Sequence, residues 1–203
     1  MSELKLVVGT DSTWSIRALL CIKISGLSCE EIVINLGDDT YQEQLKKHSE
    51  TMLVPVLIHD SLNVHDSLAI AEYINELSSR SLYPVAPNER AMARSLCAEL
   101  HSGFMHLRTV CPFTLEQAPA VILTDQIETE LSRLKSIWSS AQGLFMYKNA
   151  GVVDAFYAVL AYRLSAYGIE FDGKAGQYQQ SLLHWSLFKE AIVQANYWRK
   201  NSA

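Results

Sequence analysis

The sequence predicts a small α/β domain followed by an all-helical domain, and two patterns lead to this prediction. In the first 77 residues, short apolar runs that suit strands alternate with helical patterns. After residue 89, apolar residues recur at helical spacing and no segment has a convincing strand pattern. We therefore expect strands only in the N-terminal part of the chain.

The N-terminal part begins with a β-α-β segment. Residues 4–8 form a short apolar run that predicts a buried strand. A helical pattern follows over residues 14–25 and ends at Gly26, a residue type suited to a helix C-terminus. Residues 31–35 have a strand-like pattern, whereas residues 37–50 are polar and predict a loop that has room for a short helix.

The stretch from residue 53 to residue 67 is the most informative part of the chain. Its β-branched residues and its Asp-Ser turn predict a β-hairpin, with Pro55 at the entrance as a candidate for a cis peptide bond. After Asp66 the apolar spacing becomes helical, at Ile70, Ile74 and Leu77. A helix that starts near Ser67 offers free N–H groups to an anion, beside the main chain of Val54. A small peptide with a terminal carboxylate fits this geometry.

We place the first domain at residues 1–78, a linker at residues 79–88 and an all-helical domain at residues 89–203. The linker contains two prolines and few core residues. Apolar faces then predict four helices: from about 89 to Pro112, from about 127 to before Gly143, from about 153 to Gly168, and from about 182 to 198.

Composition and charge narrow the class of protein. The chain has 203 residues, a net charge of −5 and no basic stripe, which argues against a nucleic-acid partner. No apolar stretch approaches the ~18 residues that a membrane span needs, and the first residues do not form a signal peptide. The four cysteines form no C-x-x-C pair and the histidines have no metal-ligand spacing. We therefore expect a cytoplasmic protein with free thiols, no metal and no membrane contact.

Five segments of the chain carry a family resemblance. Residues 54–57 followed by residues 66–74 are similar to a Val-Pro-x-Leu and Glu/Gln-Ser-x-Ala-Ile signature, and residues 12–17 to Ser-x-Trp-Ser-Leu-Arg. Residues 98–108 resemble Ala-Glu-Met-His-Ser-Gly-Phe-x-x-Leu-Arg, and residues 151–154 stand at a helix capping box. Together they resemble the glutathione S-transferase family, in a bacterial branch near the zeta class. The resemblance implies an α+β thioredoxin-like domain (β-α-β-β-β-α-like), a helical C-terminal domain and a homodimer.

The resemblance also implies glutathione as a co-substrate and places its binding residues. In the family, the main chain of the residue before a cis proline pairs with the cysteinyl unit, which carries over to Val54 and Pro55. The Glu/Gln-Ser pair binds the γ-glutamyl end, which carries over to Asp66 and Ser67. A plain helix N-cap is the alternative role for Ser67, and it is compatible with binding.

By the same resemblance, Ser12 is the catalytic residue that keeps the glutathione sulfur ionised. A hydroxyl donor contributes ~1.5–3 kcal/mol and a helix N-terminus ~0.3–1 kcal/mol. Because one pKa unit takes ~1.4 kcal/mol, a thiol pKa of ~8.5 falls by about one to two units. Helix capping is the alternative for Ser12, with Asp11 and Thr13 competing for the cap. A Ser in place of a Cys disfavours mixed-disulfide chemistry.

The family positions further suggest a pocket for a small apolar electrophile. Its residues are Trp14, Phe104, Met105, His106 and Arg108. Core packing is the alternative for each of these, because aromatic and Met residues at helical spacing are core residues more often than pocket residues.

Two positions depart from the family pattern and bear on function. Leu53 stands where the family often has Lys, Arg or Gln, and the charge of Asp11 would raise the thiol pKa if it faced the sulfur. The sequence predicts an enzyme that activates glutathione for attack on an electrophile, with transfer of an alkyl or aryl group. The alternatives are a zeta-type, glutathione-dependent cis-trans isomerase and a non-catalytic binding protein on the same fold.

Overall fold

The computed structural model describes residues 3–78 and 82–201 and divides the chain into two compact units. The first unit comprises residues 1–82 and 190–203, and the second comprises residues 83–189. Residues 79–81 of the expected linker lie outside the described residues. The C-terminal segment differs from expectation, because it belongs to the first unit rather than to the helical one. It is held there by the Glu31 carboxylate, which accepts hydrogen bonds from Trp198 Nε1 at 2.6 Å and Gln194 Nε2 at 2.8 Å.

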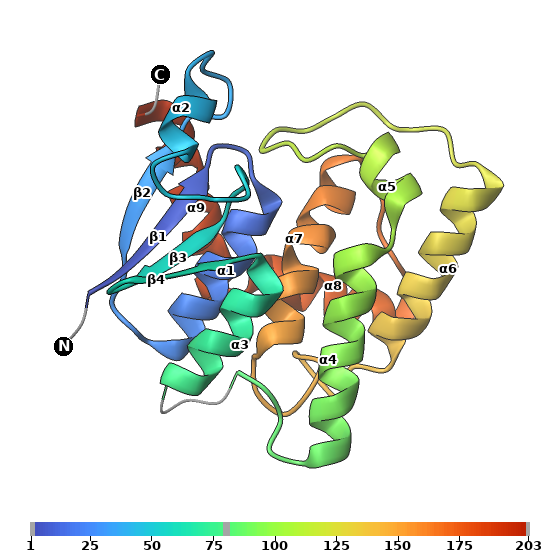
Figure 1. Cartoon of the computed structure of the whole chain (residues 1–203). Helices are drawn as coiled ribbons and strands as arrows, with labels where there is room; N and C mark the ends of the chain where they lie inside the picture. Colours follow the sequence, from blue (N-terminus) through green and yellow to red (C-terminus); the bar gives the residue numbers. More distant parts are fainter. Residues whose placement is uncertain (1–2, 79–81, 202–203) are drawn as a thin grey trace. The chain divides into compact units, whose positions relative to one another are not determined.

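The first unit is built on a mixed four-stranded sheet with the order β2-β1-β3-β4 (Figure 1). The strands are β1 (Leu4–Gly9), β2 (Glu30–Ile34), β3 (Val56–His59) and β4 (Leu62–His65). Strand β1 runs parallel to β2, with Val7 opposite Ile32, and antiparallel to β3, with Val7 opposite Val56. The predicted thioredoxin-like domain is confirmed, with the short helix α2 (Tyr41–Leu45) inside the predicted loop.

Two longer helices of the first unit lie side by side and contact the sheet (Figure 1). They are α1 (Thr13–Ser25) and α3 (Ser67–Leu77). Helix α1 ends at Gly26, whose φ of 72° is left-handed, as the sequence predicts for a C-terminal glycine. A core cluster of Val7, Ile34, Leu45 and Val56 joins the sheet to α2.

The predicted hairpin and its cis proline are confirmed. Strands β3 and β4 pair antiparallel, with Val56 opposite His65, and the turn has Asp60 at a φ of 54°. The Val54–Pro55 peptide bond is cis. Asp60 is a residue type that tolerates the left-handed region better than most, which is why the Asp-Ser turn closes here.

The second unit is helical, and its described residues contain no strand. The helices are α4 (Pro87–Ser102), α5 (Met105–Val110), α6 (Asp125–Ser139), α7 (Val152–Ala166) and α8 (Gly173–His184). Helix α7 is buried along nearly its whole length and packs against α4 and α8. Helix α9 (Ser186–Asn201) begins in this unit and continues into the first. None of the helices in the described residues has the length and apolarity to cross a membrane.

Two of the predicted helices are wrong, because each is interrupted. The helix expected from 89 to Pro112 breaks at Phe104, whose left-handed φ of 57° ends the run between α4 and α5. The helix expected from 182 to 198 breaks at Trp185, whose ψ of 125° is extended, and α8 already begins at Gly173. In both cases the apolar spacing continues across the break, so the periodicity does not reveal it.

Asp154 is the structural centre of the second unit. Its buried carboxylate accepts hydrogen bonds from the N–H groups of Gly151 at 2.9 Å and Met146 at 2.8 Å, and from the Tyr178 hydroxyl at 2.7 Å. The bond from Gly151 is the one that the predicted capping box requires. Burial raises the pKa of Asp154 to about 6, although the hydrogen bonds act in the opposite direction.

The four cysteines are free thiols, as the sequence predicts. Cys21 is fully buried, and burial raises its pKa to about 12. Burial also raises the pKa of Cys29 to about 12, with a further contribution from Glu31. These two thiols therefore stay protonated at neutral pH and are poor nucleophiles.

Candidate active site

The N-terminus of α1 presents a hydroxyl group that can still donate a hydrogen bond. Ser12 is the N-cap, 8% exposed, and its Oγ accepts a hydrogen bond from the Ser15 N–H at 3.2 Å. The Ser15 Oγ in turn accepts from the Gly9 N–H at 3.1 Å, which holds the turn between β1 and α1. A hydroxyl that accepts at oxygen keeps its own proton, and Ser12 has no acceptor for it within the described residues. Capping and donation to a ligand are therefore compatible at Ser12.

The carboxylate of Asp11, next to Ser12, is paired with a cation from the C-terminal helix. Asp11 Oδ1 lies 3.1 Å from Arg199 Nη2, and Asp11 Oδ2 lies 3.3 Å from Arg199 Nε. Both side chains are about 40% exposed, so solvent screens the pair. The guanidinium nevertheless balances the negative charge that the sequence places beside the catalytic candidate.

Val54 offers an unpaired main chain beside the Ser12 turn. In the described part of the chain, neither its N–H nor its C=O has a hydrogen-bond partner. A Cβ on Gly9 would lie 2.8 Å from Val54 Cγ2, so the missing side chain of Gly9 lets Val54 approach the end of β1. The Ser12 N–H donates to the Gly9 carbonyl at 3.3 Å, which holds the Ser12 turn against the same end of β1. The Leu53 side chain is exposed and leaves this contact unobstructed.

The start of α3 separates the roles of Asp66 and Ser67. The Asp66 carboxylate accepts from the N–H groups of Leu68 at 2.7 Å and Ala69 at 3.4 Å, so Asp66 is the N-cap. The alternative in which Ser67 is the N-cap is therefore wrong. Ser67 is the first helical residue and only 1% exposed, and no described residue hydrogen-bonds to its Oγ. A buried hydroxyl left unpaired costs about 1–3 kcal/mol, which points to a ligand as its partner.

The backbone at Asp66 is held in an unfavourable conformation. Its φ of 72° and ψ of 130° lie outside the regions that a residue with a side chain prefers. Strain of this kind persists where surrounding contacts impose it, and it is frequent at ligand sites. Here it accompanies the direct step from β4 into the N-terminus of α3.

The five residues expected in a second-substrate pocket fall into both units. Trp14 belongs to the first, where the Arg17 guanidinium lies 4.4 Å from the centre of its ring. The other four, Phe104, Met105, His106 and Arg108, lie at the start of α5 in the second unit. Phe104 is buried, whereas Met105 is 59% exposed.

Two residues of this group have structural partners at helix ends. The His106 N–H donates to Glu130 Oε1 at 3.1 Å. Arg108 Nε donates to the Gly103 carbonyl at 3.0 Å, and Nη2 donates to the Leu100 carbonyl. Burial lowers the pKa of Arg108, whose guanidinium closes the C-terminal end of α4.

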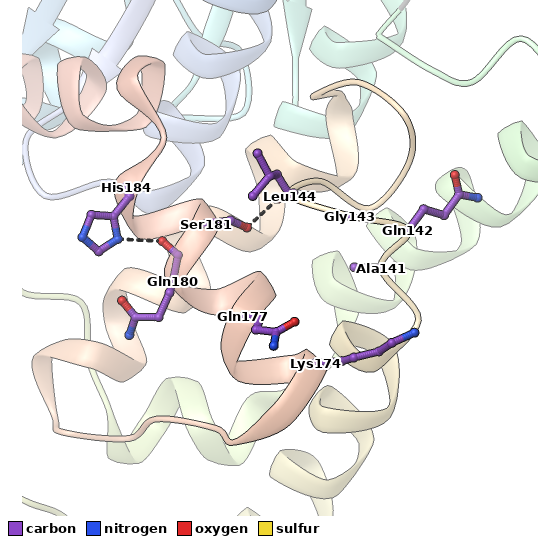
Figure 2. Close-up of a pocket in the computed structure, with 9 residues that line it drawn as sticks. All are labelled: Ala141, Gln142, Gly143, Leu144, Lys174, Gln177, Gln180, Ser181 and His184. Atoms are coloured by element: carbon purple, nitrogen blue, oxygen red, sulfur yellow. Dashed lines mark hydrogen bonds between the residues drawn. The ribbon is translucent and has the colours of Figure 1, made fainter.

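The second unit contains a hollow of about 760 Å³. Figure 2 shows the residues that line it. It is lined by residues 141–144 and by Lys174, Gln177, Gln180, Ser181 and His184 of α8. The Ser181 hydroxyl donates to the Leu144 carbonyl, and His184 Nδ1 lies 2.8 Å from the Gln180 carbonyl oxygen. No residue of the predicted site lines this hollow.

Two residues beside the site were missed by the sequence reasoning. Arg199 lies 188 positions from Asp11, and nothing in the local sequence pairs them. Ser49 lies in the loop before the hairpin and hydrogen-bonds to the main chain of Leu53. A polar residue inside a polar loop gives no signal that it is buried.

Comparisons with known proteins agree with the fold. Residues 11–77 match the family model of the glutathione S-transferase N-terminal domain. The chain is 30% identical over 102 residues to a maleylacetoacetate isomerase of Rattus norvegicus, covering 48% of this chain and 46% of the relative. It is 25% identical over 144 residues to a stringent starvation protein A homolog of Haemophilus ducreyi, covering 70% of this chain and 67% of the relative.

A solved structure extends the likeness over the whole fold. A Burkholderia glutathione transferase homolog, whose crystal structure contains bound glutathione, superposes with a TM-score of 0.73. The sequences are 24% identical, and the match covers 97% of this chain and 99% of the other. The two chains share a fold, including the helical unit that the N-terminal family model does not reach.

Proposed function

We propose that this chain is an enzyme of the glutathione S-transferase family, which binds glutathione and activates its thiol for attack on a small apolar electrophile. The match of residues 11–77 to the N-terminal family model and the shared fold support the proposal. The observation that carries the proposal is the Ser67 hydroxyl, buried at the N-terminus of α3 with no partner in the described residues. A carboxylate of glutathione would supply that partner and would also meet the unpaired N–H of the first helical turn.

The cysteinyl unit of glutathione would pair with the main chain of Val54. Support comes from the N–H and C=O groups of Val54, which have no partner in the described part of the chain, and from the family resemblance at Val54 and Pro55. An extended peptide bonds to such a segment as an added strand would. Asp66 acts in this proposal through the cap that fixes the α3 N-terminus, since its carboxylate already accepts two N–H groups.

Ser12 would stabilise the glutathione thiolate. Its hydroxyl proton is available for donation, and it stands at the positive end of α1. The thiolate sulfur forms a bond to the electrophilic carbon, and the leaving group departs with the bonding electron pair. The proton of the thiol has by then passed to solvent, so Ser12 need only donate a hydrogen bond.

The second substrate would contact residues of the group Trp14, Phe104, Met105, His106 and Arg108. Their family positions support this assignment, and the exposed Met105 offers an apolar surface. A cytoplasmic homodimer completes the proposal, on the resemblance alone. Light scattering of the purified protein tests the dimer.

A zeta-type isomerisation is the second candidate function, favoured by the match to a maleylacetoacetate isomerase. In that reaction the thiolate adds to a conjugated double bond, rotation follows, and elimination restores glutathione. The same Ser12 and Ser67 roles serve both reactions. They differ in outcome, because isomerisation regenerates glutathione whereas transfer consumes it.

Titration with reduced glutathione by calorimetry tests the proposal. We expect a dissociation constant in the micromolar to low millimolar range for the wild type. Ser67→Ala should weaken binding by about 1–3 kcal/mol without lowering the free energy of unfolding, because none of the described residues hydrogen-bonds to the hydroxyl it removes. Ser95→Ala, which removes an exposed hydroxyl of α4, is the control. A wild type that binds no glutathione at several millimolar would refute the proposal.

A further inference from the structure

Ser49 is buried beneath the loop that leads to the hairpin. It is 4% exposed, and its N–H donates to the Leu45 carbonyl at 2.8 Å, just after α2. Leu45 is itself part of the core cluster that joins α2 to the sheet. The position of the Ser49 side chain is therefore set by the core of the first unit rather than by the loop.

The Ser49 hydroxyl holds both polar main-chain groups of Leu53. Its Oγ donates to the Leu53 carbonyl at 2.8 Å and accepts from the Leu53 N–H at 3.2 Å. The Thr51 hydroxyl oxygen lies 3.1 Å from Ser49 Oγ. The Leu53 side chain contributes nothing to this arrangement, since it is 68% exposed.

The bond to the Leu53 carbonyl decides where the next N–H points. The Leu53 carbonyl and the Val54 N–H belong to one planar trans peptide, so they point in opposite directions. With the carbonyl turned toward Ser49, the Val54 N–H is turned away from the loop. This is consistent with the absence of a partner for that N–H among the described residues.

We propose that Ser49 is a positioning residue for glutathione binding, which it serves by fixing the Leu53–Val54 peptide so that the Val54 N–H faces the ligand. The inference rests on the proposed function and adds a residue to it. It also explains how the site tolerates Leu53, because the main chain of this residue matters here and its side chain does not. Without the hydroxyl, the peptide can rotate and present its carbonyl to the ligand instead.

Calorimetric titration of variants with reduced glutathione tests this role. Ser49→Ala should weaken binding about tenfold, the effect of losing about one well-placed hydrogen bond. Ser49→Thr, which keeps a hydroxyl, should restore most of the affinity. Thr51→Val is the matched control, because it removes a neighbouring hydroxyl and leaves both Leu53 bonds in place, so its affinity should stay at the wild-type value.

Amide hydrogen exchange supplies a readout that does not depend on glutathione. The Leu53 amide should exchange slowly in the wild type and fast in Ser49→Ala, while the strand amides of β3 keep their protection. If Ser49→Ala does not fold, Ser49→Cys keeps the size of the side chain with a weaker donor and should give the same loss of affinity. Wild-type affinity in a folded Ser49→Ala or Ser49→Cys variant overturns the inference alone. A wild type that binds no glutathione overturns the proposed function with it.

Discussion

Replacing Ser12 by Ala tests the proposed chemistry most directly. The change removes the acceptor for the Ser15 N–H, at 3.2 Å, and the hydroxyl proton that would reach the sulfur. Loss of the cap should lower the free energy of unfolding by about 1 kcal/mol. Loss of a hydrogen bond to a charged sulfur removes ~1.5–3 kcal/mol of thiolate stabilisation. At ~1.4 kcal/mol per unit, the pKa of the bound thiol should rise by about one to two units.

The assay is the pH dependence of kcat/KM for the electrophile, measured on the enzyme saturated with glutathione. The affinity for glutathione is measured in parallel. Ser12→Ala should lose about tenfold or more in rate near neutral pH, and its rate should approach the wild-type rate about two units higher, where the thiol ionises unaided. Ser12→Thr keeps the hydroxyl and is the control. A rate loss equal at every pH would refute thiolate stabilisation as the role of Ser12, and unchanged turnover would remove this residue from the mechanism.

Two further predictions concern charges in the two units. The folded pKa of Asp154 is raised to about 6 from 3.8, so between these values the folded state binds more protons than the unfolded state. Stability should fall by about 3 kcal/mol as pH rises from about 4 to about 7, and urea unfolding of Asp154→Asn should lack this fall. Arg199→Gln removes the cation that pairs with Asp11. The uncompensated carboxylate should then raise the pKa of the bound glutathione thiol, which is read from the pH dependence of kcat/KM for the electrophile. The rise should be smaller at high salt, and a rise that salt does not affect would argue against an electrostatic cause.

The elements of the first unit could be predicted because local chemistry specifies them. A helix that ends at Gly26 and a hairpin with an Asp-Ser turn are each encoded within a few residues. The breaks at Phe104 and Trp185 could not be predicted, because the apolar residues on both sides remain in helical phase. Such a break is set by packing in the folded unit, which a one-dimensional pattern does not contain.

The sequence suggests residue types for the candidate site, but it does not give their hydrogen-bond partners. The sequence identifies Ser12 and Ser67 as hydroxyls near helix starts, and both have the same alternative role as N-caps. Only the folded chain shows that Ser12 caps α1 whereas Asp66, rather than Ser67, caps α3. The Ser12 hydroxyl accepts a hydrogen bond from the helix, whereas the Ser67 hydroxyl has no partner in the described residues. This difference depends on side-chain rotamers, which the sequence does not specify.

The proposed glutathione site uses groups that secondary structure leaves unpaired. The first N–H groups of a helix have no partner within it, and the main chain just before a strand lies outside the ladder. Ser67 and Val54 occupy these two kinds of position, and Ser12 stands at the start of a second helix. Main-chain groups of this kind exist whatever the side chain is, so we expect a protein with Leu53 at this position still to bind glutathione. What the site requires is their orientation, and this requirement makes Ser49 more consequential than the exposed side chain of Leu53.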